Sequence, residues 1–101
     1  MVPAALRDME ELQRFLEARE GAEKAGRVMD ALEGAILSLE SQPRRGHPPQ
    51  ELAGLGLKDI LEIHHKPWRI VYQVGPKEVS ILVVADGRRD FRSLLAQRLL
   101  R

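Results

Sequence analysis

Residues 59–86, "DILEIHHKPWRIVYQVGPKEVSILVVAD", contain three runs that are rich in apolar and β-branched side chains. Short turn signals separate the runs, first at Lys66-Pro67 and then at Gly75-Pro76-Lys77. Strands joined by short turns are antiparallel neighbours. This stretch therefore predicts a three-stranded antiparallel meander, and the segments on either side of it have to cover the sheet.

The middle run, residues 68–74, alternates apolar side chains with a second set that includes Arg69 and Gln73. Successive side chains of a strand point to opposite faces, so we expect one apolar face and one face that carries Arg69. By the same alternation Tyr72, the sole tyrosine, points away from Arg69. The last run, residues 78–86, is apolar on both sides, which predicts a central strand covered on both faces or a neighbour on both edges.

Two amphipathic helices are predicted before the sheet. Residues 4–19 place apolar side chains at helical spacing, at Ala5, Met9, Leu12 and Leu16. Residues 22–41 carry a second stripe, and Gly21 between the segments predicts a tight turn and an antiparallel helical hairpin. Gly26 and Gly34 inside the second helix each cost about 1 kcal/mol relative to alanine, so we expect them to let another backbone come close.

The segment between the helices and the sheet is expected to lie on the surface. Residues 42–50, "QPRRGHPPQ", contain three prolines and a glycine, which exclude a helix or a central strand. This loop carries Arg44, Arg45 and His47. The next nine residues, "ELAGLGLKD", fit either a turn of helix or a loop, and the sequence leaves both possibilities open.

A final helix is predicted after Asp90, which can cap its first turn. Arg92 and Arg98 are expected to remain outside, while four apolar side chains face inward: Phe91, Leu94, Leu95 and Leu99. The predicted fold class is therefore α+β. An N-terminal helical hairpin packs on one face of a small antiparallel sheet, a C-terminal helix follows, and residues 1–101 form a single domain.

Composition excludes several kinds of chemistry. The chain has no cysteine, so it has no disulfide, thiolate nucleophile or cysteine-based metal site, which suits the reducing cytoplasm. The longest apolar run, Ile81 to Ala85, is far shorter than the ~20 residues of a membrane helix, and "MVPAALRDMEEL" does not resemble a signal peptide. The three histidines lack a metal-binding HxxxH spacing and no glycine-rich phosphate loop is present, so we expect no metal and no cofactor.

The charges are distributed unevenly although the net charge is only +1. Residues 1–42 hold five basic and nine acidic side chains, whereas residues 43–101 hold eleven basic and six acidic ones. A basic half favours a surface that meets phosphate or an acidic partner, although helices rich in glutamate are also common as solvated surfaces.

Four segments taken in order resemble the RelE/ParE superfamily of type II toxin–antitoxin toxins, also called plasmid stabilisation proteins. They are "PAALRDMEELQRFL", "LESQPRRGHPPQEL", "WRIVYQV" and "VSILVVADGRRD". The resemblance implies a small antiparallel sheet with a helical hairpin against it, in agreement with the periodicity. Members of the superfamily usually begin with an edge strand, and here only Met1-Val2-Pro3 precede the first helix. Either the chain starts late or that strand is missing, in which case we expect an exposed sheet edge that a partner could cover.

The resemblance implies two different activities. RelE-like members cleave messenger RNA on the ribosome, where basic side chains on the open sheet face hold phosphate and another group transfers protons. ParE-like members inhibit DNA gyrase by binding, without catalytic residues. Both kinds share the scaffold that binds the antitoxin.

Carried over to this chain, Arg69 matches the strand arginine of RelE-like nucleases, and Arg88 or Arg89 lies near their arginine after the last strand. The tyrosine of RelE would fall near Leu94 or Leu95, where this sequence has none. His64, His65 and Glu62 could substitute for it, since Glu62 and His64 share one strand face. A nuclease would therefore use Arg69, Arg89, His64 and Glu62.

The missing tyrosine, the long paired helices and the proline-rich loop favour a ParE-like toxin that binds gyrase and is neutralised by a cognate antitoxin. The alternatives are a ribosome-dependent endoribonuclease and a non-toxic member that only binds a partner. Whether the chain is an enzyme therefore stays open, as does its oligomeric state.

Four arginines are the predicted target-binding residues: Arg69, Arg88, Arg89 and Arg92. The alternative for Arg88 and Arg89 is a local network with Asp86 and Asp90 that locks the strand to the last helix, although exposed pairs contribute only about 0–1 kcal/mol. The predicted antitoxin-binding residues are Trp68, Leu95 and Leu99, which in the simpler interpretation belong to the core.

Overall fold

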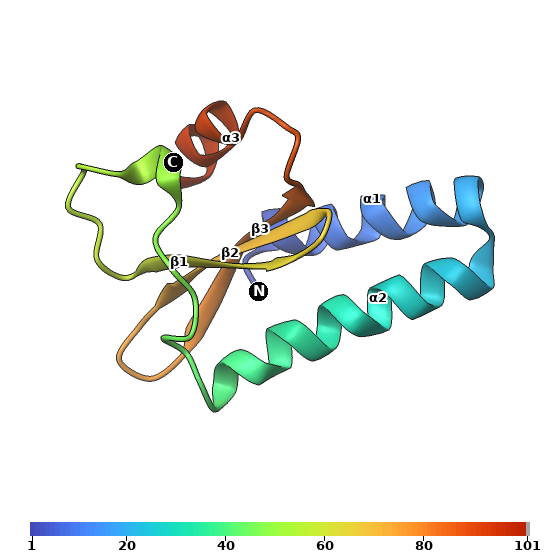
Figure 1. The fold of residues 1–101 in the computed structure, drawn as a ribbon, viewed down its shortest axis with the longest axis horizontal. Coiled ribbons are helices and arrows are strands. Elements are labelled where there is room, and N and C mark those ends of the chain that lie inside the picture. The colour runs from blue at the N-terminus through green and yellow to red at the C-terminus, as the bar shows by residue number, and fades with distance from the viewer. Residues whose placement is uncertain (101) are drawn as a thin grey trace.

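A computed structural model describes residues 1–100 of the chain (Figure 1). Two helices come first, α1 (Pro3–Glu20) and α2 (Ala22–Leu37), and α3 (Phe91–Leu99) comes last. The strands between them are β1 (Ile60–His65), β2 (Trp68–Val74) and β3 (Val79–Asp86). Two short 3-10 helices, η1 (Ser38–Glu40) and η2 (Gln50–Leu52), interrupt the connection from α2 to β1. The predicted α+β class, with a helical hairpin, a three-stranded meander and a C-terminal helix, is confirmed.

The sheet has the order β1-β2-β3, and both pairs are antiparallel. His64 lies opposite Arg69 in the first pair, and a bulge between Val71 and Tyr72 shifts the register of the second. The prediction of a central position for β3 is wrong, because β3 is an edge strand. Its side chains are apolar on both sides because helices cover both faces of the sheet.

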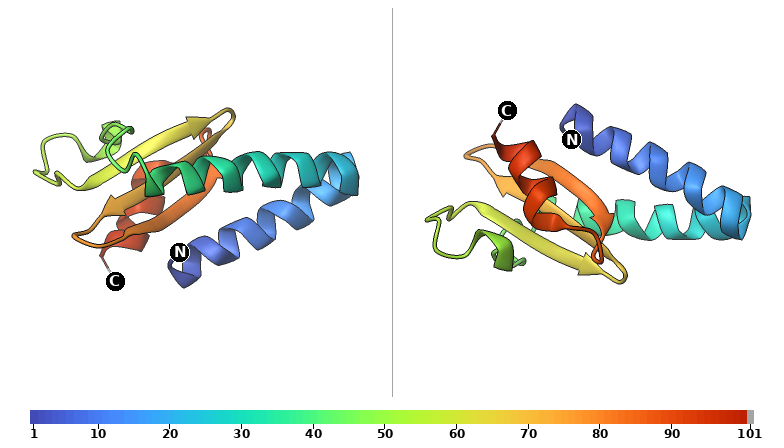
Figure 2. Two further views of the ribbon diagram at one scale, coloured as in Figure 1. Left: turned by 90° about the horizontal axis from the view of Figure 1, so that it is seen from below. Right: turned by 90° about the horizontal axis from the view of Figure 1, so that it is seen from above.

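Helices pack on opposite faces of the sheet (Figures 1 and 2). The α1–α2 hairpin covers one face and extends well beyond the strands, and α3 covers the other. Ile70 and Tyr72 lie in the core on the hairpin side, whereas Val71 packs with Phe91 and Leu95 on the α3 side. The alternation predicted for β2 is therefore confirmed.

The outer edge of β3 is covered at residues 81–84, so the expectation of an exposed edge does not hold for this part of the sheet. The Asp8 carboxylate accepts a hydrogen bond of 3.0 Å from the Val84 N–H, and the Arg98 guanidinium donates one of 2.7 Å to the Leu82 carbonyl. Asp8 and Arg98 also form an ion pair at 2.7 Å. The Val2 N–H donates to the Ile81 carbonyl at 3.2 Å. Arg98 is thus mostly buried rather than outside, because it covers the backbone groups left free at this edge.

Two other expectations about local structure are resolved. A β-carbon added at Gly26 or Gly34 would meet nothing within 4 Å, so neither glycine allows another backbone to come close. Residues 51–59, left open by the sequence, continue η2 into turns before β1.

Among residues 1–100, no helix combines the length and the apolar character that a membrane crossing requires.

Candidate functional site

Arg69 is at the centre of a charged cluster on the α3 side of the sheet. Its guanidinium donates to both carboxylate oxygens of Glu62, at 2.7 and 2.8 Å, and to both of Glu51, at 2.9 and 2.7 Å. The guanidinium carbon also lies 3.9 Å from the centre of the Phe91 ring, a cation–π contact. Only 12% of the Arg69 side chain is exposed. The hydrogen-bonding capacity of this guanidinium is therefore used largely inside the protein.

Local structure explains how these partners meet. Glu62 and His64 are two residues apart on β1 and so point to the same face, and β2 places Arg69 opposite His64. Glu51 comes from η2, and Phe91 is the first residue of α3. The hydrogen bond from Arg69 lowers the pKa of Glu51, against a smaller opposing effect of burial. Hydrogen bonding to Glu51 likewise raises the pKa of Arg69, so the pair is ionised at neutral pH.

The position of Arg69 corrects one prediction. Arg69 lies on the expected face, but that face is covered by α3 and η2, and its guanidinium is held by two carboxylates. The sheet therefore does not present an open basic face built on this arginine. The reason is that Glu51, 18 residues away in sequence, occupies the side of the guanidinium that would otherwise meet a phosphate.

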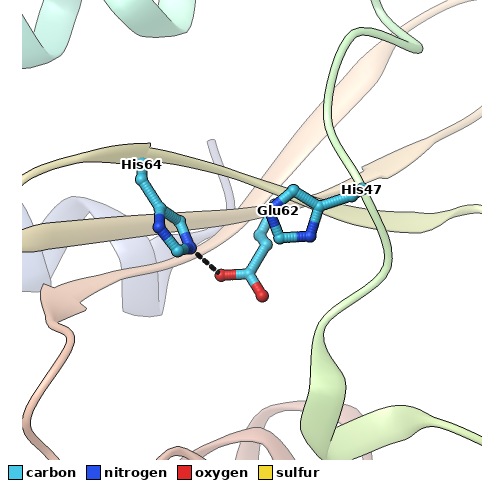
Figure 3. Close-up of side chains that lie close together, drawn as sticks. All are labelled: His47, Glu62 and His64. Atoms are coloured by element: carbon cyan, nitrogen blue, oxygen red, sulfur yellow. Dashed lines mark hydrogen bonds and ion pairs between the residues drawn. The ribbon is translucent and has the colours of Figure 1, made fainter.

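A second part of the cluster contains two histidines (Figure 3). The His64 Nε2 atom lies 2.7 Å from a Glu62 carboxylate oxygen. His47 lies beside them because a two-bond bridge joins its backbone to Glu62: the His47 N–H donates to the Glu62 carbonyl at 3.0 Å, and the Glu62 N–H donates to the His47 carbonyl at 2.7 Å. The centres of the two imidazole rings are 5.4 Å apart.

The loop that carries His47 is fixed from its other side as well. The Gly46 N–H donates to the Tyr72 hydroxyl at 3.1 Å. A β-carbon at Gly46 would lie 2.5 Å from the Glu62 carbonyl oxygen, closer than real side chains come. Only glycine therefore allows the loop to approach β1 this closely, and His47 is positioned as a result.

The histidines and the charged cluster line one concavity of about 510 Å³, together with Lys66, Trp68 and Gly87. Three of the four nuclease candidates meet here, namely Glu62, His64 and Arg69. Arg89, the fourth, does not line this concavity. Sequence reasoning missed Glu51 and Phe91 as partners of Arg69 and did not place His47 beside His64, because no spacing in the sequence signals contacts between a loop, a strand and a helix.

The arginines after β3 behave differently from one another. Arg88 donates to both carboxylate oxygens of Asp86, at 3.0 and 2.6 Å, and this hydrogen bonding lowers the pKa of Asp86 to about 2. Asp90 caps α3 by accepting a hydrogen bond from the Ser93 N–H. Arg88 therefore belongs to the local ion-pair network that was the alternative to target binding. Arg89 and Arg92 are exposed and form no ion pair with another residue in the described range 1–100.

The predicted antitoxin-binding residues lie on both sides of the sheet. Trp68 is half-buried against the hairpin core, and Leu99 is half-buried against the α3 cluster. Leu95 is fully buried under α3, so it cannot contact an antitoxin directly while α3 keeps this position. Its side chain instead supports the packing of α3 on the sheet.

The fold, with a helical hairpin on one face of an antiparallel sheet and a strand arginine on the other, is that of the toxin class expected from the sequence. A family model described as "ParE toxin of type II toxin-antitoxin system, parDE" matches residues 2–91. The chain therefore belongs to the ParE toxin family of type II toxin–antitoxin systems.

Individual relatives agree with this assignment. The chain is 25% identical over 91 residues to Toxin ParE3 of Caulobacter vibrioides, a match that covers 90% of this chain and 87% of that protein. It also resembles a solved structure described as "Chromosomal ParDE TA system from P. aeruginosa", with a TM-score of 0.66 and 17% identity over 81% of this chain and 86% of that one. At this identity the second similarity concerns the fold alone.

Proposed function

We propose that this toxin stops growth by binding and inhibiting DNA gyrase, and that a cognate antitoxin neutralises it. The observation that supports binding over catalysis is the state of Arg69. A nuclease of the RelE kind needs a strand arginine that is free to hold phosphate, whereas the Arg69 side chain is only 12% exposed and its guanidinium is hydrogen-bonded to two carboxylates. An inhibitor that acts through its surface does not need that group.

The proposed gyrase-binding surface is the exposed rim where β3 passes into α3. Arg89 and Arg92 are exposed there without an ion-pair partner among residues 1–100, and the Arg88 side chain is 85% exposed beside Asp86. Unpaired basic groups attract an acidic protein surface at little desolvation cost and mainly increase the association rate. Arg69 is withdrawn from the predicted target-binding set, because it is not accessible.

The test is inducible expression of the full chain in a bacterial host with DNA and protein synthesis labelled separately, together with a supercoiling assay on purified gyrase. DNA synthesis should fall first, and the purified toxin should inhibit supercoiling. The double variant Arg89→Glu/Arg92→Glu should lose most of the inhibition. Arg14→Glu, an exposed charge reversal on α1, is the matched control. Normal supercoiling together with cleaved transcripts would refute the proposal.

A ribosome-dependent nuclease is the second candidate, and one observation favours it. His64 lies 2.7 Å from Glu62 inside an open concavity, which is the arrangement of a histidine oriented by a carboxylate for proton transfer. His64→Ala distinguishes the two functions, because the side chain is exposed and its removal leaves the core intact. A nuclease should lose toxicity in this variant, whereas a gyrase inhibitor that acts through the rim should keep it.

The antitoxin part of the proposal rests on the family and on the similar solved structure, which is described as a toxin–antitoxin system. Co-expression with the product of a neighbouring small gene should restore growth, and the two proteins should purify as a complex. Full toxicity in the presence of every neighbouring gene product would contradict neutralisation by a cognate antitoxin. The third possibility, a non-toxic member, predicts normal growth without any antitoxin.

A further inference from the structure

The histidine part of the cluster has the composition of a metal site. We propose that His47, Glu62 and His64 together bind one divalent transition-metal ion, with Zn²⁺ as the favoured ion. Each residue offers one ligand atom, and these atoms all lie within 4.8 Å of one another (Figure 3). Two imidazoles and one carboxylate are donors that Zn²⁺ and neighbouring transition metals prefer over Mg²⁺ or Ca²⁺.

The backbone holds the three ligands in place before any ion arrives. His47 and Glu62 are joined by two backbone hydrogen bonds, and Glu62 and His64 share one face of β1. Bond lengths of about 2.0–2.1 Å in a tetrahedral site bring ligand atoms to about 3.3 Å from each other. The ligand atoms, which now lie within 4.8 Å of one another, therefore have to come closer. Both imidazoles are exposed, so rotation of their side chains can bring them together without moving the strand.

The ligand set itself, two neutral imidazoles and the Glu62 carboxylate, carries one negative charge. Arg69 pairs with both Glu62 and Glu51, and the positive charge of Arg92 also acts on Glu51. Lys66 also lines the concavity but forms no ion pair with Glu62. Within residues 1–100, Glu62 pairs only with Arg69 and, when His64 is protonated, with His64. Arg69 fixes the orientation of the Glu62 carboxylate, as hydrogen-bond partners of metal ligands commonly do.

The ion would add a further link between the loop at His47 and β1, which two backbone hydrogen bonds already join. His47 belongs to the connection between η1 and η2, and the concavity that contains the ligands opens to solvent, so an ion can reach them. Three protein ligands leave coordination positions for water. Because the metal binds the folded arrangement, it should stabilise the fold and clamp residues 42–50 to β1.

The experiment uses the full chain, first treated with a chelator and then titrated with Zn²⁺ by calorimetry, with Co²⁺ absorption as a report on coordination geometry. One Zn²⁺ should bind per chain, and the melting temperature should rise. His47→Ala and His64→Ala should each weaken the affinity by about tenfold or more, because each removes a ligand.

His65→Ala is the matched control, because His65 is the third histidine of the chain, exposed, and next to His64 on the opposite face of β1. Equal losses in the His64→Ala and His65→Ala variants would mean adventitious binding to surface imidazoles and would refute the site. Absence of saturable binding would also refute it. Circular dichroism of each variant excludes unfolding as the cause, and calorimetry makes the result independent of toxicity and of the gyrase proposal.

Discussion

The guanidinium of Arg69 joins three separate parts of the fold: β1 through Glu62, η2 through Glu51, and α3 through Phe91. Burial of a charge is costly unless it is paired and hydrogen-bonded, and here every charged group in the cluster has a partner. Glu62, whose side chain is only 3% exposed, depends on Arg69 most strongly. The cluster therefore acts as a structural crosslink between elements.

The Arg69→Met substitution tests this role. It leaves the buried Glu62 carboxylate with only His64 as a side-chain partner, so the free energy of unfolding should fall by about 3–5 kcal/mol. The double variant Glu62→Leu/Arg69→Met removes both buried charges and should recover more than half of that loss. Urea unfolding followed by circular dichroism measures both values. A single-variant loss below about 1 kcal/mol would show that the crosslink is not structural.

At the scale of elements, Gly34 lowers the helix propensity of α2 although no neighbouring group needs the space that glycine leaves. Gly34 lies in the interior of the helix and is exposed, and a β-carbon there would meet no neighbouring atom within 4 Å. Gly46 presents the opposite case, because its missing side chain makes room for the Glu62 carbonyl. The two glycines therefore have opposite tolerance for alanine.

Gly34→Ala should raise the free energy of unfolding by about 0.5–1 kcal/mol, since alanine restricts the unfolded chain and favours the helix. Gly46→Ala should lower it by about 2 kcal/mol or more, since its β-carbon would lie 2.5 Å from the Glu62 oxygen. Chemical denaturation of the two variants side by side provides the comparison. Equal effects of the two substitutions would contradict the packing described for the loop at Gly46.

Helices α1 and α3 are connected across the edge of β3 by Asp8 and Arg98. This pair differs from an ordinary surface ion pair, because its side chains are 11% and 15% exposed and because each also binds a backbone group of β3. Hydrogen bonding to Asp8 raises the pKa of Arg98. The two side chains together take the place of part of a neighbouring strand.

Asp8→Ala should cost about 2–4 kcal/mol, because it leaves the Val84 N–H without its acceptor and Arg98 without its counter-ion. It should also promote self-association, because the Val84 N–H on the outer edge of β3 then lacks its partner. Sedimentation of the variant at several concentrations detects the association. Arg27→Ala is the control, since it breaks only an exposed pair with Glu23 and should change stability by at most about 0.5 kcal/mol.

At the scale of the whole molecule, low pH should weaken the fold. The pKa of Glu51 is lowered from its ordinary value of 4.5 by Arg69, and that of Asp86 from 3.8 to about 2 by Arg88. A carboxyl group with a lowered pKa stabilises the folded state above its unfolded pKa, and that stability is lost as the pH falls through the folded value. Stability should therefore decrease from about pH 4.5 down to about pH 2.

Urea titrations at about pH 7, 4, 3 and 2 measure this decrease. The Asp86→Asn variant should be less stable at neutral pH and should show a shallower decline at the acidic end, since it lacks one of the carboxylates that titrate there. A profile that stays flat from about pH 5 to 2 in the unsubstituted chain would contradict the assigned ion pairs.

Periodicity was enough to predict the helical hairpin, the three strands, the final helix and the faces of β2, because these depend on local spacing. It could not predict which residues come into contact when they are far apart in the sequence. The Glu51–Arg69 pair joins a loop turn to a strand, the His47–Glu62 bridge depends on the room left by Gly46, and Arg98 finds Asp8 from the far end of the sequence. The sequence therefore could not predict which candidate side chains are accessible, as the mostly buried side chain of Arg69 shows.

The pair formed by residues 8 and 98 also sets an order of events during synthesis. Arg98 is synthesised after helix α1 and all three strands, and until then Asp8 and the backbone of β3 lack the partner that completes the edge. At about 5–20 residues per second, the 12 residues that follow Asp86 up to Arg98 take about 0.6–2.4 s to add. A β3 edge that lacks Arg98 has an unpaired Leu82 carbonyl of the kind that pairs with other strands, so protection of this edge is complete only once α3 has packed on the sheet.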